Sequence, residues 1–594
     1  MQGKAMRKGG SFLVEETPAQ EVFTPEDFRE EHKMLIKTTK DFVENEVVPH
    51  AEELENKDFE LARRLMRQAG ALGLLGVDVP EEYGGGGLGI IASLLVGEHF
   101  VAGGSITVAA NAHTGIGTMP LVFFGNKAQK AKYLPGLASG EKIASYALTE
   151  PGAGTDAMSM QATAVLSPDG KCYKLNGTKQ FITNGGFADI ITVYAKVGGE
   201  KITAFVLERS FPGISTGPEE KKMGLRGSST VSVILEDVQV PVENVVFEVG
   251  KGHTVAFNIL DLGRLKLAAA SIGVAKLAIE RSVKYGKERI QFGKPICQFG
   301  LIKHKIAEMA VRAYMGESMV YRTGGLIEAV LDSVDRTADD SGRQSGKAIA
   351  EYAIECSINK VFCSEMLGYV GDEAVQIHGG YGYIEEYQVE RTYRDNRIFR
   401  IVEGTNEINR VITVGFLMRK ALKNEIPLLA AIEKLKSELP GMKPVSTHIA
   451  GGPLAYEHAL IERAKKVLLL VAGAAVGKYG EAVSEEQEIL GRISDIAAEV
   501  FAMESGLLRT AKAIEVFGKE ASRLKVDMVR VYVNEAMPQV HEYAVGALAA
   551  IYSGDELTKQ LAALSSMTHV SPVNVIGLRR AIADKVIAAE KYIC

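Results

Sequence analysis

Hydrophobic residues along the chain change from helical spacing to strand-like spacing and back. Between residues 25 and 140, apolar positions repeat with helical spacing, as in segments 25–48 and 59–72, and glycines separate the segments. Between residues 146 and 250, short β-branched runs such as 201–207 and 231–235 alternate with tight-turn signals. Helical spacing then returns from residue 253 to about 420. The pattern predicts a β domain between two helical domains.

Beyond residue 420 the chain passes through a segment rich in Pro and Gly and becomes helical again to its end. Within that segment, several leucines and one isoleucine share a helical face, namely Leu428, Leu429, Ile432, Leu435 and Leu439. They predict a helix docked on the core, with a membrane-surface or partner-binding helix as the alternative. The expected parts are a loose lead (1–24), an N-terminal helical domain (25–145), a β domain (146–250), a helical-bundle domain (251–420), a hinge (421–455) and a C-terminal helical domain (456–594).

Composition supports a folded protein without nucleic acid as a partner. The chain has 594 residues, of which 46% are hydrophobic and 24% charged, and its net charge of −6 provides no bulk attraction to nucleic acid or to an anionic membrane. The apolar run 467–476 is about half of what a bilayer requires, so a buried helix is expected there. Membrane association is not indicated, although it is left open.

Cysteine usage and the N-terminus favour a reducing, cytoplasmic location. The five cysteines are scattered without a CxxC or Cys/His pairing, so neither a disulfide framework nor a metal site is expected. The first residues carry basic side chains but lack the apolar core of a signal peptide, and no transit peptide is recognised.

One carboxylate stands out as a candidate general base. Glu403 follows Ile401 and Val402 and precedes Gly404. A carboxylate held against apolar side chains loses solvation, so its pKa rises towards the range useful for taking a proton near neutral pH. A solvated structural glutamate is the commoner interpretation of such a residue in isolation.

Segment 146–156 has the residue types of a cofactor-binding turn. Gly152 and Gly154 open the backbone between Thr149 and Thr155. The threonine hydroxyls and the neighbouring amides can donate to a carbonyl, a ring nitrogen or a phosphate. An ordinary glycine-rich turn is the alternative.

Two later segments add a flat surface and close-approach glycines. Phe181 and Thr183 combine an aromatic plane with a hydroxyl, which suits a flat heterocycle, whereas a strand that ends at a turn is the simpler interpretation. In segment 376–383, two glycines follow His378, which by itself is more often a hydrogen-bonded structural histidine than a catalyst. The chain has no HExxH or Walker-type loop, so neither hydrolysis nor phosphoryl transfer is indicated.

Taken together, segments 149–156, 376–395 and 403–406 resemble, in order and spacing, the signatures of the acyl-CoA dehydrogenases. The resemblance covers essentially the whole chain and is strongest to the very-long-chain acyl-CoA dehydrogenases, because shorter-chain members end near the position of Lys420. It implies an α+β fold that is mainly α, with an N-terminal helical domain, a middle β-barrel or sandwich domain, a four-helix-bundle domain and an extra all-helical C-terminal domain.

The family resemblance implies FAD-dependent α,β-dehydrogenation of a fatty acyl-CoA to the trans-2-enoyl-CoA in fatty acid β-oxidation. Electrons would pass to an electron-transfer flavoprotein, and the enzyme would be a homodimer. The alternatives are an acyl-CoA oxidase that reduces oxygen and a non-enzymatic assembly or scaffold protein on the same fold. A DNA-associated relative is remote because the chain is acidic and has no basic run.

The resemblance also assigns residues. Glu403 is the expected base, and Gly263, which matches the position of the base in some relatives, cannot serve. The expected FAD contacts are Tyr146, Leu148, Thr149, Gly154, Thr155, Phe181, Ile182, Thr183, Arg289, Phe292, Gln376, Gly379, Gly380, Thr405 and Glu407. The expected substrate contacts are Thr155, Leu260, Asp261, Arg264, Val402 and Gly404.

Two departures from the family pattern and one stretch of small residues refine these expectations. Val402 stands where an aromatic residue often precedes the base, and Phe181 stands where many relatives have a tryptophan, a residue that this chain lacks. Arg289 is expected to reach a flavin pyrophosphate across a subunit interface. Small residues dominate segment 108–117, which would line the acyl tunnel, so a preference for long chains is our hypothesis.

Overall fold

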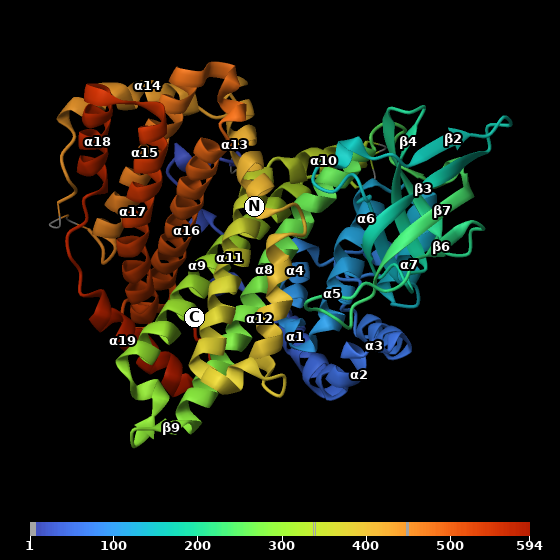
Figure 1. Ribbon diagram of the computed structural model, residues 1–594, viewed down its shortest axis with the longest axis horizontal. Coiled ribbons are helices and arrows are strands. Elements are labelled where there is room, and N and C mark those ends of the chain that lie inside the picture. The colour runs from blue at the N-terminus through green and yellow to red at the C-terminus, as the bar shows by residue number, and fades with distance from the viewer. Residues whose placement is uncertain (1–6, 337, 339, 447–448, 450) are drawn as a thin grey trace. The chain divides into compact units, whose positions relative to one another are not determined.

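The computed structural model describes residues 7–336, 338, 340–446, 449 and 451–594, and its chain divides into two compact units (Figure 1). The sheet unit comprises Arg29–Gly273 and Ile327–Ala350. The bundle unit comprises the described residues of Met1–Phe28, Val274–Leu326 and Glu351–Cys594. Helices α8 (Gly252–Glu288) and α9 (Gly300–Leu331) contribute residues to both units.

Helices come first in the sheet unit because apolar residues repeat at helical spacing there. They are α1 (Glu30–Phe42), α2 (Ala51–Glu55), α3 (Phe59–Ala71), α4 (Gly89–His99), α5 (Ser105–Ala112), α6 (Met119–Phe124) and α7 (Lys127–Ala138), and α10 (Ser341–Ala350) belongs to the same unit. Their apolar sides meet in a core that includes Phe42, Val47, Leu65, Leu74 and Phe100. This core supports the start of the sheet, since Ile143 also belongs to it.

The sheet follows at the β-branched runs. Its strands are β1 (Ala144–Ala147), β2 (Thr163–Leu166), β3 (Cys172–Thr183), β4 (Ile190–Val197), β5 (Lys201–Glu208), β6 (Ile214–Thr216), β7 (Thr230–Pro241) and β8 (Val245–Val246). Within the described residues they form one sheet in the order β6-β7-β3-β2-β4-β5-β8, and β1 pairs in parallel with β4. Buried side chains such as Leu175, Val193, Phe205 and Val233 form its core.

The bundle unit is helical apart from a short hairpin of β9 (Ile290–Gln291) and β10 (Lys294–Pro295) in the part of the chain that the structure describes. Besides α8 and α9, its helices are α11 (Ala353–His378), α12 (Gln388–Asn396), α13 (Asn406–Leu422), α14 (Leu428–Glu438), α15 (Ala455–Tyr479), α16 (Gln487–Phe517), α17 (Arg523–Ile551), α18 (Gly554–Thr568) and α19 (Val575–Ala589). The predicted fold class, a β domain framed by helical domains with an additional helical C-terminus, is therefore confirmed.

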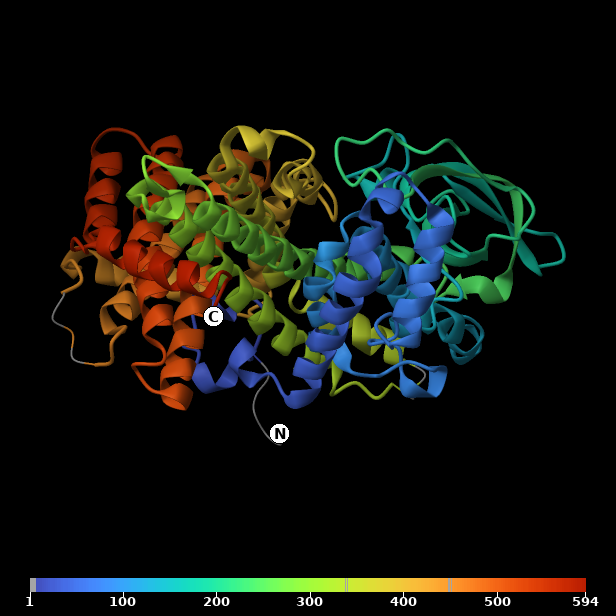
Figure 2. The ribbon, with the colours of Figure 1, turned by 90° about the horizontal axis from the view of Figure 1, so that it is seen from below.

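The C-terminal helices α15, α16 and α17 pack side by side, as two orthogonal views show (Figures 1 and 2). The apolar run 467–476 lies within α15, and residues 467, 468 and 471 are at most 1% exposed, as expected for a buried helix. Among the described residues, every helix is too short or too polar to cross a membrane.

The predicted helix of the hinge is α14, and it docks on its neighbours. Leu428, Ile432 and Leu435 are buried, and Ile432 packs so closely on α15 that a Cβ at Gly473 would lie 2.7 Å from it. Leu429 was assigned to the same face, which is wrong, because its side chain is 42% exposed. The docking face of α14 is therefore narrower than the sequence pattern indicates.

The expected loose lead is wrong for residues 7–24, while Met1–Met6 lie outside the described residues. Phe12 and Leu13 are buried, and the Phe12 ring centre lies 4.8 Å from that of Phe501 on α16. The Gly10 N–H donates to Glu355 Oε1 on α11 at 2.7 Å. The lead is ordered because its partners come from helices far along the chain, which local composition does not reveal.

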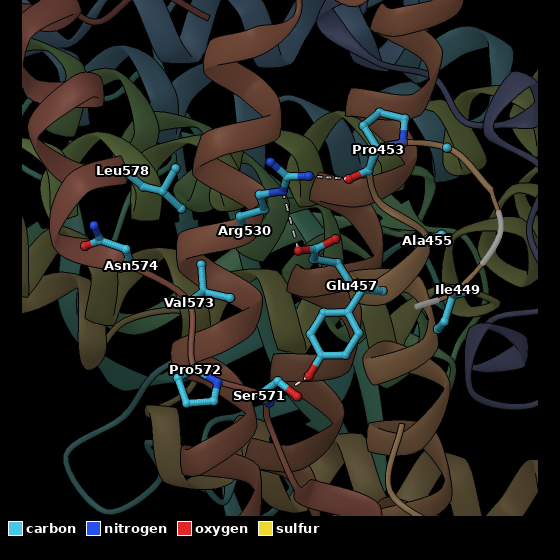
Figure 3. Close-up of a pocket in the computed structure, with 12 residues that line it drawn as sticks. Ile449, Pro453, Ala455, Glu457, Arg530, Ser571, Pro572, Val573, Asn574 and Leu578 are labelled. Carbon is cyan, nitrogen blue, oxygen red and sulfur yellow. Dashed lines mark hydrogen bonds and ion pairs between the residues drawn. The ribbon is translucent and has the colours of Figure 1, made fainter. Parts of the chain in front are cut away.

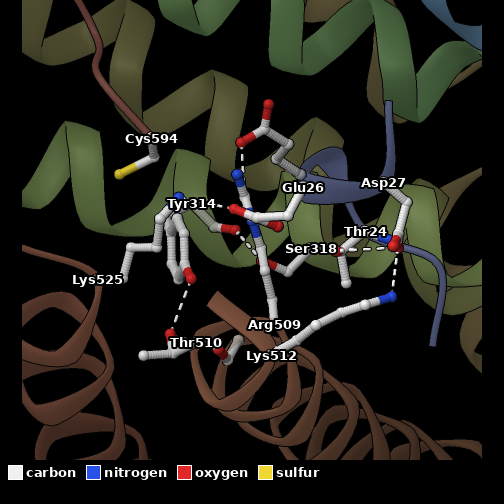
Figure 4. Close-up of polar contacts among 12 residues, drawn as sticks. Thr24, Glu26, Asp27, Tyr314, Ser318, Arg509, Thr510, Lys512, Lys525 and Cys594 are labelled. Carbon is white, nitrogen blue, oxygen red and sulfur yellow. Dashed lines mark hydrogen bonds and ion pairs between the residues drawn. The ribbon is translucent and has the colours of Figure 1, made fainter. Parts of the chain in front are cut away.

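A buried ion cluster joins the segment directly after this lead to the bundle and to the C-terminal helices (Figure 4). Arg509 on α16 is fully buried, and its guanidinium donates to Glu26 at 3.0 Å and to Glu317 on α9 at 2.6 Å. Lys525 on α17 donates to Glu26 at 2.7 Å, and the guanidinium carbon of Arg509 lies 4.5 Å from the centre of the Tyr314 ring. Although burial raises the pKa of Glu26, Arg509 and Lys525 hold it below its usual value.

We predict that Arg509→Met destabilises the protein by about 3–5 kcal/mol, because it leaves two buried carboxylates without their shared cation. Urea unfolding followed by circular dichroism measures the loss. Arg343→Met is the matched control: Arg343 pairs with Glu248 at 2.6 Å, but its side chain is 53% exposed. The control should cost less than about 1 kcal/mol, and equal losses would contradict the role of the buried cluster.

Candidate active site

Glu403 lies in a turn between the 3-10 helix Arg397–Arg400 and α13. Its backbone φ is 57°, in the left-handed region that residues other than glycine rarely adopt. Such a conformation costs on the order of 1–3 kcal/mol and persists only where the surroundings impose it. The side chain is half-buried, and its Oε2 atom is inaccessible to solvent.

Two side chains hold the backbone of this turn through hydrogen bonds to its carbonyl groups. Lys360 on α11 is fully buried, and its ammonium donates to the Gly404 carbonyl at 2.7 Å. The Asn409 side-chain amide donates to the carbonyls of Gly404 and Thr405 at 2.8 and 3.0 Å, and more weakly to that of Glu403 at 3.3 Å. The main chain of the turn that contains Glu403 is therefore fixed through its carbonyl groups.

The start of α13 is capped by residues of the same segment. Thr405 is the N-cap, and its hydroxyl accepts a hydrogen bond from the Ile408 N–H at 3.3 Å. The backbone N–H of Glu407 itself and then the Thr405 hydroxyl lower the pKa of the Glu407 carboxyl by hydrogen bonding. Thr405 and Glu407, two expected FAD contacts, thus stabilise the helix that follows the candidate base.

The apolar shield expected from the two preceding residues is wrong. Ile401 and Val402 are 48% and 40% exposed, so these side chains do not bury the carboxylate. Their backbone N–H groups both donate to the Ile398 carbonyl, at 2.8 and 3.1 Å, which turns the chain and directs the side chains outwards. Sequence neighbours of a turn residue need not be its packing neighbours.

In the sheet unit, the structure brings the first two cofactor-type segments together. The Gln180 N–H donates to the Thr149 carbonyl at 2.8 Å, and the Lys179 ammonium donates to the Leu148 carbonyl at 3.2 Å. Between Lys179 and Ile182 the register of β3 with β7 shifts, and Phe181 adopts a φ of 59°. The bulge directs the Phe181 ring outwards, where it is 59% exposed.

Three of the expected FAD contacts in these segments are buried. The side chains of Tyr146, Leu148 and Ile182 belong to the core. By contrast, Thr155 is exposed, and a Cβ placed at Gly154 would meet no atom within 4 Å. An exposed aromatic plane beside an open, glycine-containing backbone is the arrangement that a flat ligand requires.

A buried ion pair fixes the first segment. Lys179 is fully buried, and its ammonium lies 2.7 Å from Glu150 Oε1. Glu150 also accepts hydrogen bonds from the N–H groups of Gln161 and Ala162, at 2.5 and 3.0 Å. Burial lowers the pKa of Lys179, while its bond to Glu150 opposes that shift. The pair thereby connects β3 to both ends of the turn that contains Gly152 and Gly154.

Three of the expected substrate residues of the sheet unit lie on α8. The Arg264 guanidinium donates to Asp261 Oδ1 at 2.6 Å, and both side chains are buried, whereas Leu260 is half-buried. Burial raises the pKa of Asp261 to about 6, although Arg264 acts against the shift. Gly263 lies on the same helix and provides no carboxylate.

The bundle unit contains the remaining expected cofactor residues. Gln376, Gly379 and Gly380 are exposed at the end of α11, and a Cβ at either glycine would meet no atom within 4 Å. His378 is buried, and its Nδ1 lies 2.7 Å from the Ala374 carbonyl, which agrees with a structural histidine. Its ring stacks on Tyr285 of α8 with centres 4.2 Å apart.

The hairpin next to these residues presents a cation and an aromatic ring. Arg289 is exposed, and its guanidinium carbon lies 5.6 Å from the centre of the Tyr381 ring. Phe292 and Gly293 form the tip of the hairpin with φ values of 51° and 78°, and Phe292 is 94% exposed. The expected site residues thus fall into two groups, one in each unit.

Sequence reasoning missed the residues that hold these turns: Lys360, Asn409 and Lys179. The available signal was a lysine in an otherwise apolar or uncharged run, as in Ile358-Asn359-Lys360-Val361. A charged residue at a buried position needs internal partners, so it marks a polar network.

A pocket of about 460 Å³ lies elsewhere in the bundle unit, between α15, α17 and the segment before α19 (Figure 3). Arg530 and Glu457 face each other in it, with 3.6 Å between Nε and Oε1. None of the expected catalytic, cofactor or substrate residues is among those that line it.

Comparison with known proteins matches four domain descriptions to this chain. The acyl-CoA dehydrogenase N-terminal domain matches residues 29–141, the middle domain 145–238 and the C-terminal domain 250–417. A further acyl-CoA dehydrogenase C-terminal domain matches residues 463–566. The matches therefore extend to helices beyond residue 420, namely those within residues 463–566.

Individual relatives match three quarters of the chain or more. The chain is 52% identical to a "Probable acyl-CoA dehydrogenase" of Bacillus subtilis, covering 99% of this chain and 98% of the relative. It is 39% identical to the human "Very long-chain specific acyl-CoA dehydrogenase, mitochondrial" over 75% of this chain and 69% of the relative. The structure of an acyl-CoA dehydrogenase complexed with FAD from Bacillus anthracis matches with a TM-score of 0.96 and 51% identity, covering 99% of this chain and 100% of that one.

We predict that Lys179→Met destabilises the protein by about 3–5 kcal/mol, since it leaves the Glu150 carboxylate buried without a cation. Thermal and urea unfolding measure the effect. In the double variant Lys179→Met/Glu150→Gln, the amide oxygen still accepts from one of the two backbone N–H groups and no buried charge remains, so part of the stability should return. A double variant as unstable as the sum of both single changes would contradict this account.

Proposed function

We propose that this protein oxidises long-chain fatty acyl-CoA thioesters at the Cα–Cβ bond, which gives the trans-2-enoyl-CoA. The basis is that the chain belongs to the acyl-CoA dehydrogenase family. FAD is the cofactor, and an electron-transfer flavoprotein is the proposed electron acceptor. The reaction would serve fatty acid β-oxidation. The observation that carries the proposal is the left-handed Glu403 turn, held by Lys360 and Asn409.

Glu403 is the proposed base. A thioester α-proton is weakly acidic, so its removal needs a carboxylate that is held in one position and donors that stabilise negative charge on the thioester oxygen. The proton moves from the substrate α-carbon to the Glu403 carboxylate, and the Glu403 N–H is the proposed donor to the thioester carbonyl. When bound, FAD supplies the acceptor for the β-hydrogen, which leaves as a hydride.

The residues present fit a flavin. An isoalloxazine ring is flat, and the Phe181 ring is exposed beside a backbone that is open at Gly154. A dinucleotide also carries a pyrophosphate, for which the exposed Arg289 is a proposed partner. The other proposed FAD contacts are those expected from the sequence, with Tyr146, Leu148 and Ile182 acting through their main chain.

The proposed assembly is a homodimer in which Arg289 and Phe292 reach the cofactor of the partner subunit. In support, both residues are exposed at the hairpin of the bundle unit, and the Phe292 ring is 94% exposed. A large aromatic ring at a hairpin tip is costly to leave in water, so contact with a second copy explains its presence.

The long-chain preference is supported by the very-long-chain relative rather than by the small residues of segment 108–117. Gly117 has a packing reason for its size, because a Cβ there would lie 2.8 Å from the Cβ of Ala144 on β1. Gly115 likewise faces the side chain of the buried Lys266. Small side chains in this segment therefore do not by themselves open a channel.

We predict that Glu403→Gln retains FAD but slows substrate-dependent bleaching of the flavin by about 10²–10⁴-fold, because the amide cannot take the α-proton. Anaerobic stopped-flow mixing with palmitoyl-CoA measures the rate. Glu425→Gln, which removes an exposed carboxylate beyond the end of α13, is the matched control and should bleach at the unmodified rate. Undiminished bleaching by Glu403→Gln with normal FAD content would remove Glu403 from its role.

A second prediction concerns chain length. With the purified enzyme and an electron-transfer flavoprotein, we expect kcat/KM for palmitoyl-CoA to exceed that for butyryl-CoA by at least ten-fold, since each buried methylene contributes about 0.8 kcal/mol. Faster turnover of butyryl-CoA would refute the long-chain preference. Rapid reoxidation of the reduced flavin by air, with formation of peroxide, would instead favour an oxidase.

A further inference from the structure

Helix α13 begins directly after the Glu403 turn, and one arginine binds it to the C-terminal helix α16. The Arg410 guanidinium on α13 donates to Glu365 Oε2 on α11 at 3.0 Å and to Asp495 Oδ1 on α16 at 2.6 Å. A second contact joins Arg410 Nη1 to Glu365 Oε1 at 2.9 Å. Because two carboxylates from different helices share one guanidinium, the position of α13 is set relative to both α11 and α16.

Asn406 connects the Glu365 carboxylate to Lys360, which in turn holds the Glu403 turn. It is the first residue of α13 and is buried. Its Nδ2 donates to Glu365 Oε1 and to the Ser364 hydroxyl, both at 3.0 Å, while its Oδ1 accepts from the Lys360 ammonium at 2.7 Å. The same ammonium donates to the Gly404 carbonyl at 2.7 Å.

These contacts form one continuous path of polar bonds, each no longer than 3.0 Å, from Asp495 through Arg410, Glu365, Asn406 and Lys360 to the carbonyl next to Glu403. Asp495 lies outside residues 29–417, which match the N-terminal, middle and first C-terminal domains of the family, and inside the separately matched stretch 463–566. The far end of the path therefore belongs to the additional helical domain.

We propose that the additional C-terminal domain braces the catalytic base, with Asp495, Arg410 and Lys360 as positioning residues for Glu403. The proposal rests on the proposed role of Glu403 as the base. Proton transfer depends steeply on the position of the base, and a displacement of about 1 Å can cost 10²-fold in rate. A left-handed backbone at Glu403 needs such support, because it is not the conformation that the residue adopts unaided.

The test compares rates of flavin bleaching per bound flavin after anaerobic mixing of the holoenzyme with palmitoyl-CoA. Asp495→Asn keeps the size of the side chain but removes the charge that holds Arg410, so we expect the rate to fall about ten-fold, with FAD content and the dissociation constant of palmitoyl-CoA unchanged. Asp495→Glu, which keeps a carboxylate for Arg410, should recover most of the rate.

A control variant separates bracing from general loosening of the C-terminal domain. Arg579 on α19 also forms a buried ion pair with the rest of the bundle unit, at 2.7 Å to Glu308 on α9. Arg579→Met should lower the unfolding temperature yet leave the bleaching rate per flavin unchanged. If it slows bleaching as much as Asp495→Asn does, the specific path is refuted.

A double variant tests whether the two ends of the path act together. If Asp495 and Lys360 position Glu403 through the same path, Asp495→Asn/Lys360→Met should be little slower than Lys360→Met alone. The bracing proposal is overturned if the rate losses of the two single variants multiply in the double variant, or if neither single variant bleaches more slowly than the unmodified protein. Glu403→Gln at the full rate would instead overturn the proposed function, so the two failures are distinguishable.

Discussion

A cation that is removed from water must find oxygen partners inside the protein, and this constraint organises both units. The charged form of a buried lysine or arginine is stable only where carbonyls or carboxylates surround it. Lys360, Lys179 and Arg509 are all fully buried, and each donates hydrogen bonds to groups from segments distant in the sequence. The same requirement that makes these residues costly also makes them specific, because a displaced segment would leave the charge without its partner.

The consequence for the site is that its turns are fixed from their buried side. Lys360 bonds the carbonyl of Gly404, and Lys179 bonds that of Leu148, so in both turns the main chain is held by oxygen atoms. The Glu403 carboxylate therefore belongs to a turn whose main chain is already held in place. Preorganisation of this kind reduces the rearrangement that is needed when a side chain acts on a ligand.

The sequence predicts the architecture well because strand and helix periods differ and need no partner to be recognised. The sheet begins at Ala144 and ends at Val246, close to the predicted limits of 146 and 250. The sequence fails where a segment depends on distant partners. Residues 7–24 look loose in isolation but are packed by residues such as Glu355 and Phe501. Likewise, Ile401 and Val402 precede Glu403 in the chain yet do not cover it. Lys360 resembles a solvated helix charge until the Gly404 carbonyl is placed against it.

Three residues that the sequence places in the site have strained backbone conformations. Glu403, Phe181 and Phe292, each expected in the site from the sequence, adopt φ values of 57°, 59° and 51°. Glycine would occupy these conformations with less strain, so the side chains are retained at a cost of order 1–3 kcal/mol each. Phe292 is the clearest of the three cases, because a two-residue hairpin tip with positive φ at both positions favours asparagine or aspartate before glycine. An aromatic ring there, 94% exposed, contributes little to the stability of the subunit that carries it. Its presence at the tip therefore supports the proposed contact with a second copy of the chain.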